Sequence, residues 1–175
     1  MRLEIMQHII LIGFMGTGKS TVGQEVARQL GCSFADLDAA VVAREGRSIP
    51  EIFATDGEAY FRERESQALA DMLNHSTRHV IATGGGIVLR EHNRELMRDG
   101  GYIVHLAASK EAILARVKRD RNRPLLQGDM EERVSKLIQQ REGLYDFAHT
   151  TIATDNETAV QLAARICKLA DGSCK

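Results

Sequence analysis

The sequence has no tryptophan, only two prolines and three cysteines, and few aromatic residues overall. The cysteines, Cys32, Cys167 and Cys174, are odd in number and widely scattered, without the spacing of a disulfide framework or a metal site. This usage argues against a small disulfide-stabilised secreted domain. We therefore expect a protein of the reducing cytoplasm.

Net charge is nearly absent, because 23 basic residues are balanced by 24 acidic ones. No overall field exists to hold nucleic acid or an anionic membrane surface. Long apolar runs are missing too: charged residues interrupt every window of the roughly 20 residues needed to cross a bilayer. The apolar run at Ile9 to Ile12 is too short for the core of a signal peptide. We expect a soluble chain that is not cleaved and has neither a nucleic-acid nor a membrane partner.

The apolar pattern predicts strands that alternate with helices. The branched run from Ile9 to Ile12 is typical of a strand buried on both faces of a sheet. Further short strands are expected at Ser33 to Asp36, His79 to Ala82, Tyr102 to Leu106 and Thr151 to Ala153. Alternation of this kind predicts an α/β fold, with a five-stranded parallel sheet between two helical layers. At 175 residues, we expect one domain over 1–175.

Two helix starts carry specific signals. Ser48 and Glu51, on either side of Pro50, have the spacing of a capping box. Asp155 or Asn156 is expected to cap the last helix.

The strongest motif is Gly13-Phe-Met-Gly-Thr-Gly-Lys19-Ser20, which matches the phosphate-loop pattern between an apolar strand and an amphipathic helix. Glycines let successive amide groups face one anion, and the helix adds the positive end of its dipole. Lys19 is expected to contact the β- and γ-phosphates and Ser20 to bind magnesium. The candidate ATP-binding residues are Gly16, Thr17, Gly18, Lys19, Ser20 and Thr21. The alternative, a chance glycine-rich turn, does not explain the matching context.

Two carboxylates, Asp36 and Asp38, lie where the second strand gives way to a helix. Magnesium bound to a nucleotide commonly has a carboxylate near such strand ends, and Asp36 is the candidate that orders it through water. Asp38 would point the same way if the chain is extended there, toward the second substrate. The alternative for either residue is a helix cap or a solvated turn.

Thr83-Gly84-Gly85-Gly86 follows the third strand at the edge where parallel sheets bind ligands. The triple glycine offers bare backbone to a ligand, although a flexible turn is the alternative.

The candidate arginines are Arg62, Arg123 and Arg141. A guanidinium group matches a carboxylate bidentately or stabilises a transferring phosphoryl group. Taken singly, an arginine is more often a solvated surface residue. The basic stretch from Arg116 to Arg123 is typical of a mobile lid, expected at about 116–129. It lacks the interleaved aromatics of a nucleic-acid patch.

In combination these motifs resemble the shikimate kinases, a family with the nucleoside-monophosphate-kinase-like phosphate-loop fold. The resemblance spans most of the chain. It rests on the phosphate loop to Gly23, Phe34-Ala-Asp-Leu-Asp38, Ile52-Phe53, Gly57-Glu58, Phe61-Arg-Glu-Arg-Glu65, Gly84-Gly-Gly86, Arg123-Pro-Leu-Leu126, and Arg141 with Tyr145 and Ala148.

The resemblance implies transfer of the γ-phosphate of ATP to the 3-hydroxyl of shikimate, with Mg²⁺, on the way to chorismate and the aromatic amino acids. It implies a shikimate-binding subregion at about 36–66, and it places shikimate against Asp38, Arg62, Gly84, Gly85, Gly86 and Arg141. Lys19, Asp38 and Arg123 would be catalytic, Arg123 as the lid arginine at the phosphates, and Arg116 would lie near the adenine. We expect a monomer.

Other functions remain open from the residues alone. A GTPase is disfavoured, because no Asn-Lys dipeptide exists to form the guanine-recognition element Asn-Lys-x-Asp. A kinase for gluconate or a nucleotide would share the loop and the lid. A non-catalytic nucleotide-sensing module is the remaining alternative.

Overall fold

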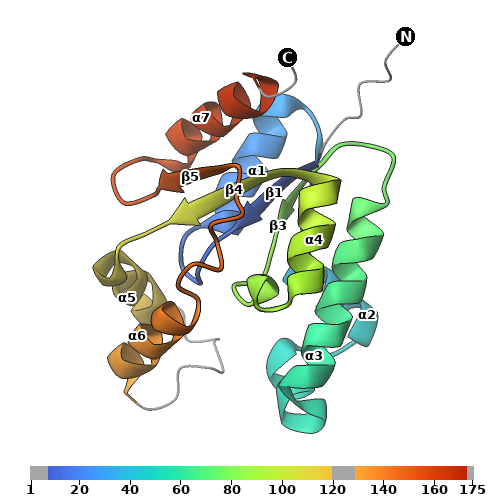
Figure 1. Ribbon diagram of the computed structural model, residues 1–175, viewed down its shortest axis with the longest axis vertical. Helices are drawn as coiled ribbons and strands as arrows, with labels where there is room; N and C mark the ends of the chain where they lie inside the picture. Colours follow the sequence, from blue (N-terminus) through green and yellow to red (C-terminus); the bar gives the residue numbers. More distant parts are fainter. Residues whose placement is uncertain (1–7, 120–128, 173–175) are drawn as a thin grey trace.

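The chain alternates strands and helices from His8 to Gly172. The computed structural model describes residues 8–119 and 129–172 (Figure 1). The strands are β1 (His8–Ile12), β2 (Ser33–Asp36), β3 (His79–Ala82), β4 (Gly101–Ala107) and β5 (Thr150–Ala153). All neighbours pair in parallel, in the order β2-β3-β1-β4-β5. The predicted five-stranded parallel sheet is confirmed, and its strands start and end within one residue of the expected positions.

Helices cover both faces of this sheet. On one face lie α1 (Lys19–Leu30) and α7 (Ala159–Gly172); on the other lie α2 (Leu37–Glu45), α3 (Ile49–Leu73), the short η1 (Ile87–Leu89) and α4 (Glu91–Gly100). The remaining pair, α5 (Lys110–Arg119) and α6 (Met130–Gln140), stands beyond the carboxyl ends of the strands (Figure 1). No helix formed by the described residues is both long and apolar enough to span a membrane.

The central strand β1 shows why its sequence is apolar without a break. Ile9 and Leu11 belong to the core beneath α1 and α7, whereas Ile10 and Ile12 belong to the core beneath α3 and α4. All four side chains are completely buried. Successive side chains of a strand point to opposite faces, so a strand covered on both faces must be apolar at every position.

The strand order sets the position of the functional edge. Because β1 lies between β3 and β4, the loop after β1 and the loop after β3 leave the sheet side by side. Thr83 fastens the two together: its backbone N–H and its Oγ1 donate to the Leu11 carbonyl at 3.1 and 2.9 Å. The phosphate loop and the triple glycine therefore share one edge.

Of the two predicted helix caps, one is confirmed and one is wrong. Ser48 and Glu51 form the capping box at the start of α3. Asp155 does not cap α7, because its carboxylate accepts hydrogen bonds from the backbone N–H and Oγ of Ser109, before α5. The helix α7 begins at Ala159 instead, after a reciprocal pair of hydrogen bonds between Thr158 and Gln161.

We predict that Ser48→Ala lowers the free energy of unfolding by about 1 kcal/mol, because an orphan amide at the start of α3 loses its acceptor. Thr55→Ala, at an exposed position in the same helix, is the control and should change stability by less than about 0.5 kcal/mol. Urea denaturation measures both. Equal losses in the two variants would contradict the importance of the capping box.

Candidate functional site

Hydrogen bonds from its own side chains hold the phosphate loop in shape. Gly18 caps α1 in the left-handed conformation, at φ 86°, which a residue with a side chain rarely adopts. Thr17 Oγ1 donates to the Phe14 carbonyl at 2.8 Å, and Lys19 Nζ donates to the carbonyls of Gly13 and Phe14 at the same distance. The loop is thus held around its own lysine at the positive end of the α1 dipole.

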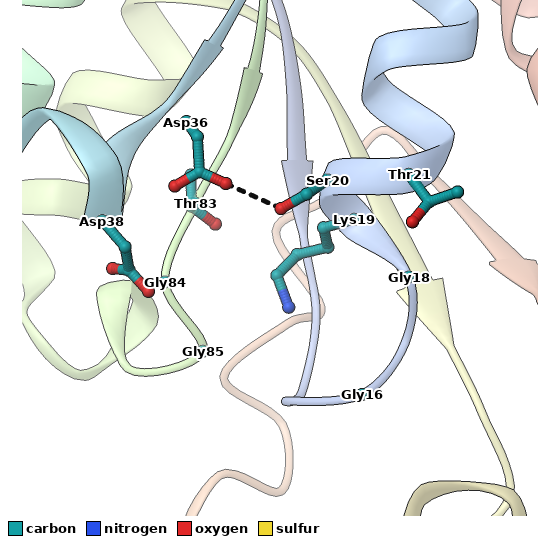
Figure 2. A pocket seen from close by; sticks show the side chains of 10 residues that line it. All are labelled: Gly16, Gly18, Lys19, Ser20, Thr21, Asp36, Asp38, Thr83, Gly84 and Gly85. Atoms are coloured by element: carbon teal, nitrogen blue, oxygen red, sulfur yellow. Dashed lines mark hydrogen bonds between the residues drawn. The ribbon is translucent and has the colours of Figure 1, made fainter. Parts of the chain in front are cut away.

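Asp36 serves two neighbours at the end of β2. Its Oδ1 accepts from the Ala39 amide at 3.0 Å, which caps α2, and its Oδ2 accepts from Ser20 Oγ at 2.7 Å (Figure 2). The helix-cap alternative for Asp36 is therefore confirmed, but the cap uses only one oxygen. The other oxygen and Ser20 Oγ are hard oxygen donors beside the phosphate loop, and this donor set suits Mg²⁺, which keeps several waters of its own.

A cleft of about 250 Å³ joins the loop to the predicted acceptor residues. It is lined by Gly16, Gly18, Lys19, Ser20, Thr21, Asp36, Asp38, Thr83, Gly84 and Gly85 (Figure 2). Asp38 is not in an extended segment, because α2 begins at Leu37. Its carboxylate nevertheless lies on the Gly84 side of the cleft, whereas the Asp36 carboxylate lies on the Ser20 side (Figure 2).

Each glycine of the triple glycine faces a charged side chain at close range. A Cβ atom on Gly84 would lie 2.6 Å from Glu65 Oε1 and 2.8 Å from Asp38 Oδ1. One on Gly86 would lie 2.4 Å from both terminal nitrogens of Arg62, and one on Gly85 would lie 3.2 Å from Arg141 Nη1. Side chains at these positions would displace the charged groups, which gives the three glycines a packing role in addition to the turn that they form.

Arg62 is buried on α3 and is held by two carboxylates. Its Nη1 donates to Glu65 Oε2 at 2.9 Å, and its Nη2 donates to Glu58 Oε1 at 3.0 Å. Burial opposes the charged form, but these two carboxylates outweigh it and raise the pKa of Arg62. The guanidinium group therefore stays charged beside Gly86.

Arg141 is only 3% exposed and sits at the carboxyl end of α6. Its guanidinium carbon lies 5.2 Å from the centre of the Phe14 ring. Within the part of the chain that the structure describes, neither its Nε nor its Nη1 has a hydrogen-bond partner. A buried cation with unsatisfied donors is costly, and an anionic ligand would remove that cost.

Glu65 is a member of the site that the sequence analysis did not single out. It is completely buried, and while Oε2 holds Arg62, Oε1 has no hydrogen-bond partner among the described residues. Burial, with a smaller contribution from Asp38, raises the pKa of Glu65 to about 6 against the opposing effect of Arg62 and Arg141. Its spacing of three residues from Arg62 on a helix was the available signal.

Of the two basic-segment candidates, one is placed by the structure. Arg116 lies on α5, and its Nη1 donates to the Gly16 carbonyl at 3.0 Å and to Thr154 Oγ1 at 3.2 Å. It thereby ties α5 to the phosphate loop. Residues 120–128 of the predicted lid, with Arg123, lie outside the described residues.

Fold and site together define an ATP-dependent phosphotransferase with a small acceptor. The phosphate loop matches the pattern of a nucleotide site, and its cleft extends to Asp38, Gly84 and Gly85. Glu65 lies next to Gly84 and Arg141 next to Gly85, and both are buried.

Comparisons with known proteins specify the class further. The shikimate kinase family model matches residues 15–170. The shikimate kinase of Geobacter sulfurreducens is 46% identical over 161 residues, which are 91% of this chain and 88% of that protein. The shikimate kinase of Moorella thermoacetica is 45% identical, over 91% of each chain. The structure of shikimate kinase from Acinetobacter baumannii in complex with shikimate superposes with a TM-score of 0.92, at 39% identity, over 97% of this chain and 96% of that one.

The chain belongs to the shikimate kinase family. Membership of the family confirms the predicted activity, which is transfer of the γ-phosphate of ATP to the 3-hydroxyl of shikimate. It also confirms that the reaction belongs to aromatic amino acid biosynthesis. A gluconokinase from Sinorhizobium meliloti shares only 20% identity, with a TM-score of 0.65, and so shares the fold alone.

We predict that stability depends on pH through Glu65. Its pKa in the folded state, about 6, lies above the ordinary value of 4.5, so the folded state binds this proton more tightly than the unfolded state. The resulting stabilisation is complete below pH 4.5 and is lost as the pH rises through 6. Between pH 4.5 and 7, Glu65→Gln should gain about 1–2 kcal/mol relative to the unaltered protein.

Urea denaturation across this pH range measures the effect. Glu63→Gln is the matched control, because Glu63 lies on the same helix and its hydrogen bond to Arg90 lowers the pKa of its carboxyl. This variant should show no relative gain as the pH rises. A difference between Glu65→Gln and the unaltered protein that does not change with pH would contradict the assignment.

Proposed function

We propose that shikimate binds at the end of the described cleft that is lined by Asp38, Gly84 and Gly85, with Arg141 next to Gly85 and Arg62 next to Gly86. Arg62 and Arg141 would bind the carboxylate of shikimate, and Asp38 would contact its hydroxyls. Gly84, Gly85 and Gly86 would form the floor beneath the ring, because charged groups of the site already occupy the space where side chains would stand.

The single observation that carries this proposal is the state of Arg141. Its guanidinium group is almost completely buried, yet Nε and Nη1 find no hydrogen-bond partner among the described residues. A carboxylate provides two acceptor oxygens in the plane of the guanidinium group, which is the geometry these donors need. Arg62 differs from Arg141 in that its guanidinium group is paired with Glu58 and Glu65. These two ion pairs fix the orientation in which the guanidinium group would meet the ligand.

On the nucleotide side, the loop amides and Lys19 would bind the phosphates. The lysine ammonium group donates hydrogen bonds to two loop carbonyls, so it is directed at the centre of the loop. Ser20 and Asp36 would hold Mg²⁺, Ser20 directly and Asp36 through water. When bound, Mg²⁺ would neutralise charge on the phosphate oxygens. Arg116 donates to the Gly16 carbonyl of the loop and would lie near the adenine.

Asp38 would position the attacking hydroxyl and accept its proton. The hydroxyl oxygen forms a bond to the γ-phosphorus, the bond from that phosphorus to the bridging oxygen of ADP breaks, and the hydroxyl proton passes to the carboxylate. Because the transition state of phosphoryl transfer is loose, positioning contributes more than early deprotonation. We further infer that the chain acts as a monomeric single-domain kinase in the cytoplasm.

We predict that Arg141→Lys raises the KM for shikimate about tenfold or more and leaves the KM for ATP unchanged, because lysine lacks the planar pair of donors. The methyl ester of shikimate sharpens the test, since it has no carboxylate charge. The variant and the unaltered enzyme should handle the ester almost equally. Arg28→Lys, at an exposed arginine of α1, is the control. If Arg141→Lys raised the KM for shikimate and for its methyl ester by the same factor, the assignment of Arg141 to the carboxylate would be refuted.

We predict that Asp38→Asn lowers kcat/KM for shikimate by about 10²- to 10⁴-fold, because the amide keeps the shape of the side chain but is not a base. Nucleotide affinity, measured by fluorescence titration, should stay within a factor of two or so of the unaltered value. Asp36→Asn is the contrasting variant and should raise the Mg²⁺ requirement instead. Near-normal turnover in Asp38→Asn would remove Asp38 from the catalytic residues.

A further inference from the structure

An aromatic pair stands behind the acceptor site, at the carboxyl end of β4. The rings of His105 and Tyr145 are stacked, with centroids 4.4 Å apart and planes only 6° from parallel. Tyr145 lies in the turn after α6, four residues beyond Arg141. Its hydroxyl donates a long hydrogen bond, of 3.4 Å, to the carbonyl of Gly85. The pair therefore reaches from a central strand to the middle of the triple glycine.

The Tyr145 hydroxyl also lies beside Arg141. Burial raises the pKa of Tyr145, while the Arg141 guanidinium group partly opposes the rise, so the phenol keeps its proton and remains a donor. Arg141 and Gly85 are themselves neighbours, since a Cβ atom on Gly85 would lie 3.2 Å from Arg141 Nη1. The hydroxyl, the guanidinium group and the Gly85 backbone thus form one compact cluster.

His105 gives this cluster a rigid support. It pairs in the sheet with Ile12, the last residue of β1 before the phosphate loop. Burial lowers the pKa of His105, and Lys19 lowers it further against the opposing effect of Asp146. The imidazole is therefore neutral, so it stacks on Tyr145 without adding a cation next to Lys19 and Arg141. A planar ring fixed to the sheet restricts where the phenol can lie.

We propose that Tyr145, supported by His105, is a positioning residue for the acceptor. Its hydroxyl holds the Arg141 guanidinium group in one arrangement relative to the Gly85 backbone, so that the guanidinium group meets the carboxylate of the acceptor in a single pose. The proposal rests on the proposed function, because it takes Arg141 to be the carboxylate-binding group.

The test is Tyr145→Phe, which keeps the ring and its stack and removes only the hydroxyl. The KM for shikimate should rise about three- to tenfold, the effect of one lost hydrogen bond. The KM for ATP and the slow hydrolysis of ATP without acceptor should not change. A purely structural role would instead lower the melting temperature and raise both KM values together, and that result would overturn the proposal.

The strand that contains His105, β4, also offers a matched control for Tyr145. Tyr102, near the start of β4, stacks on His149 with centroids 5.1 Å apart, away from the cleft. Tyr102→Phe removes a hydroxyl from a similar aromatic pair and should leave every kinetic constant unchanged. If Tyr102→Phe raised the KM for shikimate as much as Tyr145→Phe does, the specific role of Tyr145 would be refuted.

His105 is tested by two substitutions. His105→Ala removes the support and should raise the KM for shikimate by a similar factor, whereas His105→Phe restores a planar ring and should return the KM close to normal. If His105→Ala does not fold, His105→Phe still tests the support role of the ring. A KM for shikimate raised in His105→Phe as much as in Tyr145→Phe would overturn that role. A normal KM in His105→Phe supports it.

Combining Tyr145→Phe with Arg141→Lys separates this proposal from the function on which it rests. If the two residues act together, the double variant should lose much less than the product of the single losses. If Arg141→Lys alone leaves the KM for shikimate unchanged, the proposed function fails. If Arg141→Lys raises that KM but Tyr145→Phe does not, only the positioning proposal is overturned.

Discussion

The acceptor site depends on the balance of buried charge beneath the triple glycine. Two guanidinium groups, Arg62 and Arg141, and one carboxylate, Glu65, are almost completely removed from water. Burying a charge is costly unless it is paired and hydrogen-bonded. Arg62 is satisfied by Glu58 and Glu65, whereas Arg141 keeps donors without a described partner. The protein thus keeps a buried positive group with unsatisfied donors next to Gly85.

The phosphate loop differs from this cluster, because its polar side chains are hydrogen-bonded within the protein. Lys19 is held by loop carbonyls, and Ser20 donates to Asp36. The Asp36 carboxylate contacts two elements: one oxygen caps α2, and this contact fixes the direction of the other, which accepts from Ser20. A loop prepared in this way loses little conformational entropy when phosphate binds.

Contacts from the α5–α6 region reach both halves of the site. Arg116, on α5, holds the Gly16 carbonyl of the phosphate loop, while Tyr145, after α6, contacts the Gly85 carbonyl of the triple glycine. Both acceptors are backbone carbonyls of glycine-containing loops. The geometry of the nucleotide and acceptor loops is therefore supported from one structural unit beyond the edge of the sheet (Figure 1).

The sequence by itself determined the features that depend on residues close together along the chain. The phosphate loop, the capping box at Ser48 and the apolar run of β1 follow from local backbone chemistry and from the alternation of side chains along a strand. The five-stranded sheet followed from the number of such strands, and the set of motifs was sufficient to indicate the family.

Only the tertiary structure decided which distant groups meet. In the folded chain Asp155 accepts a hydrogen bond from Ser109 and does not cap α7. The Oε1 of Glu65 lies next to Gly84, and the ring of Tyr145 stacks on that of His105. These pairings join residues about 20 to 46 positions apart, so no local pattern records them. Burial, too, is decided by the tertiary structure. The residue type alone does not distinguish Arg141 from Arg28, which is exposed on α1. The packing of α6 against Phe14 removes Arg141 from water and leaves its Nε and Nη1 without partners among the described residues.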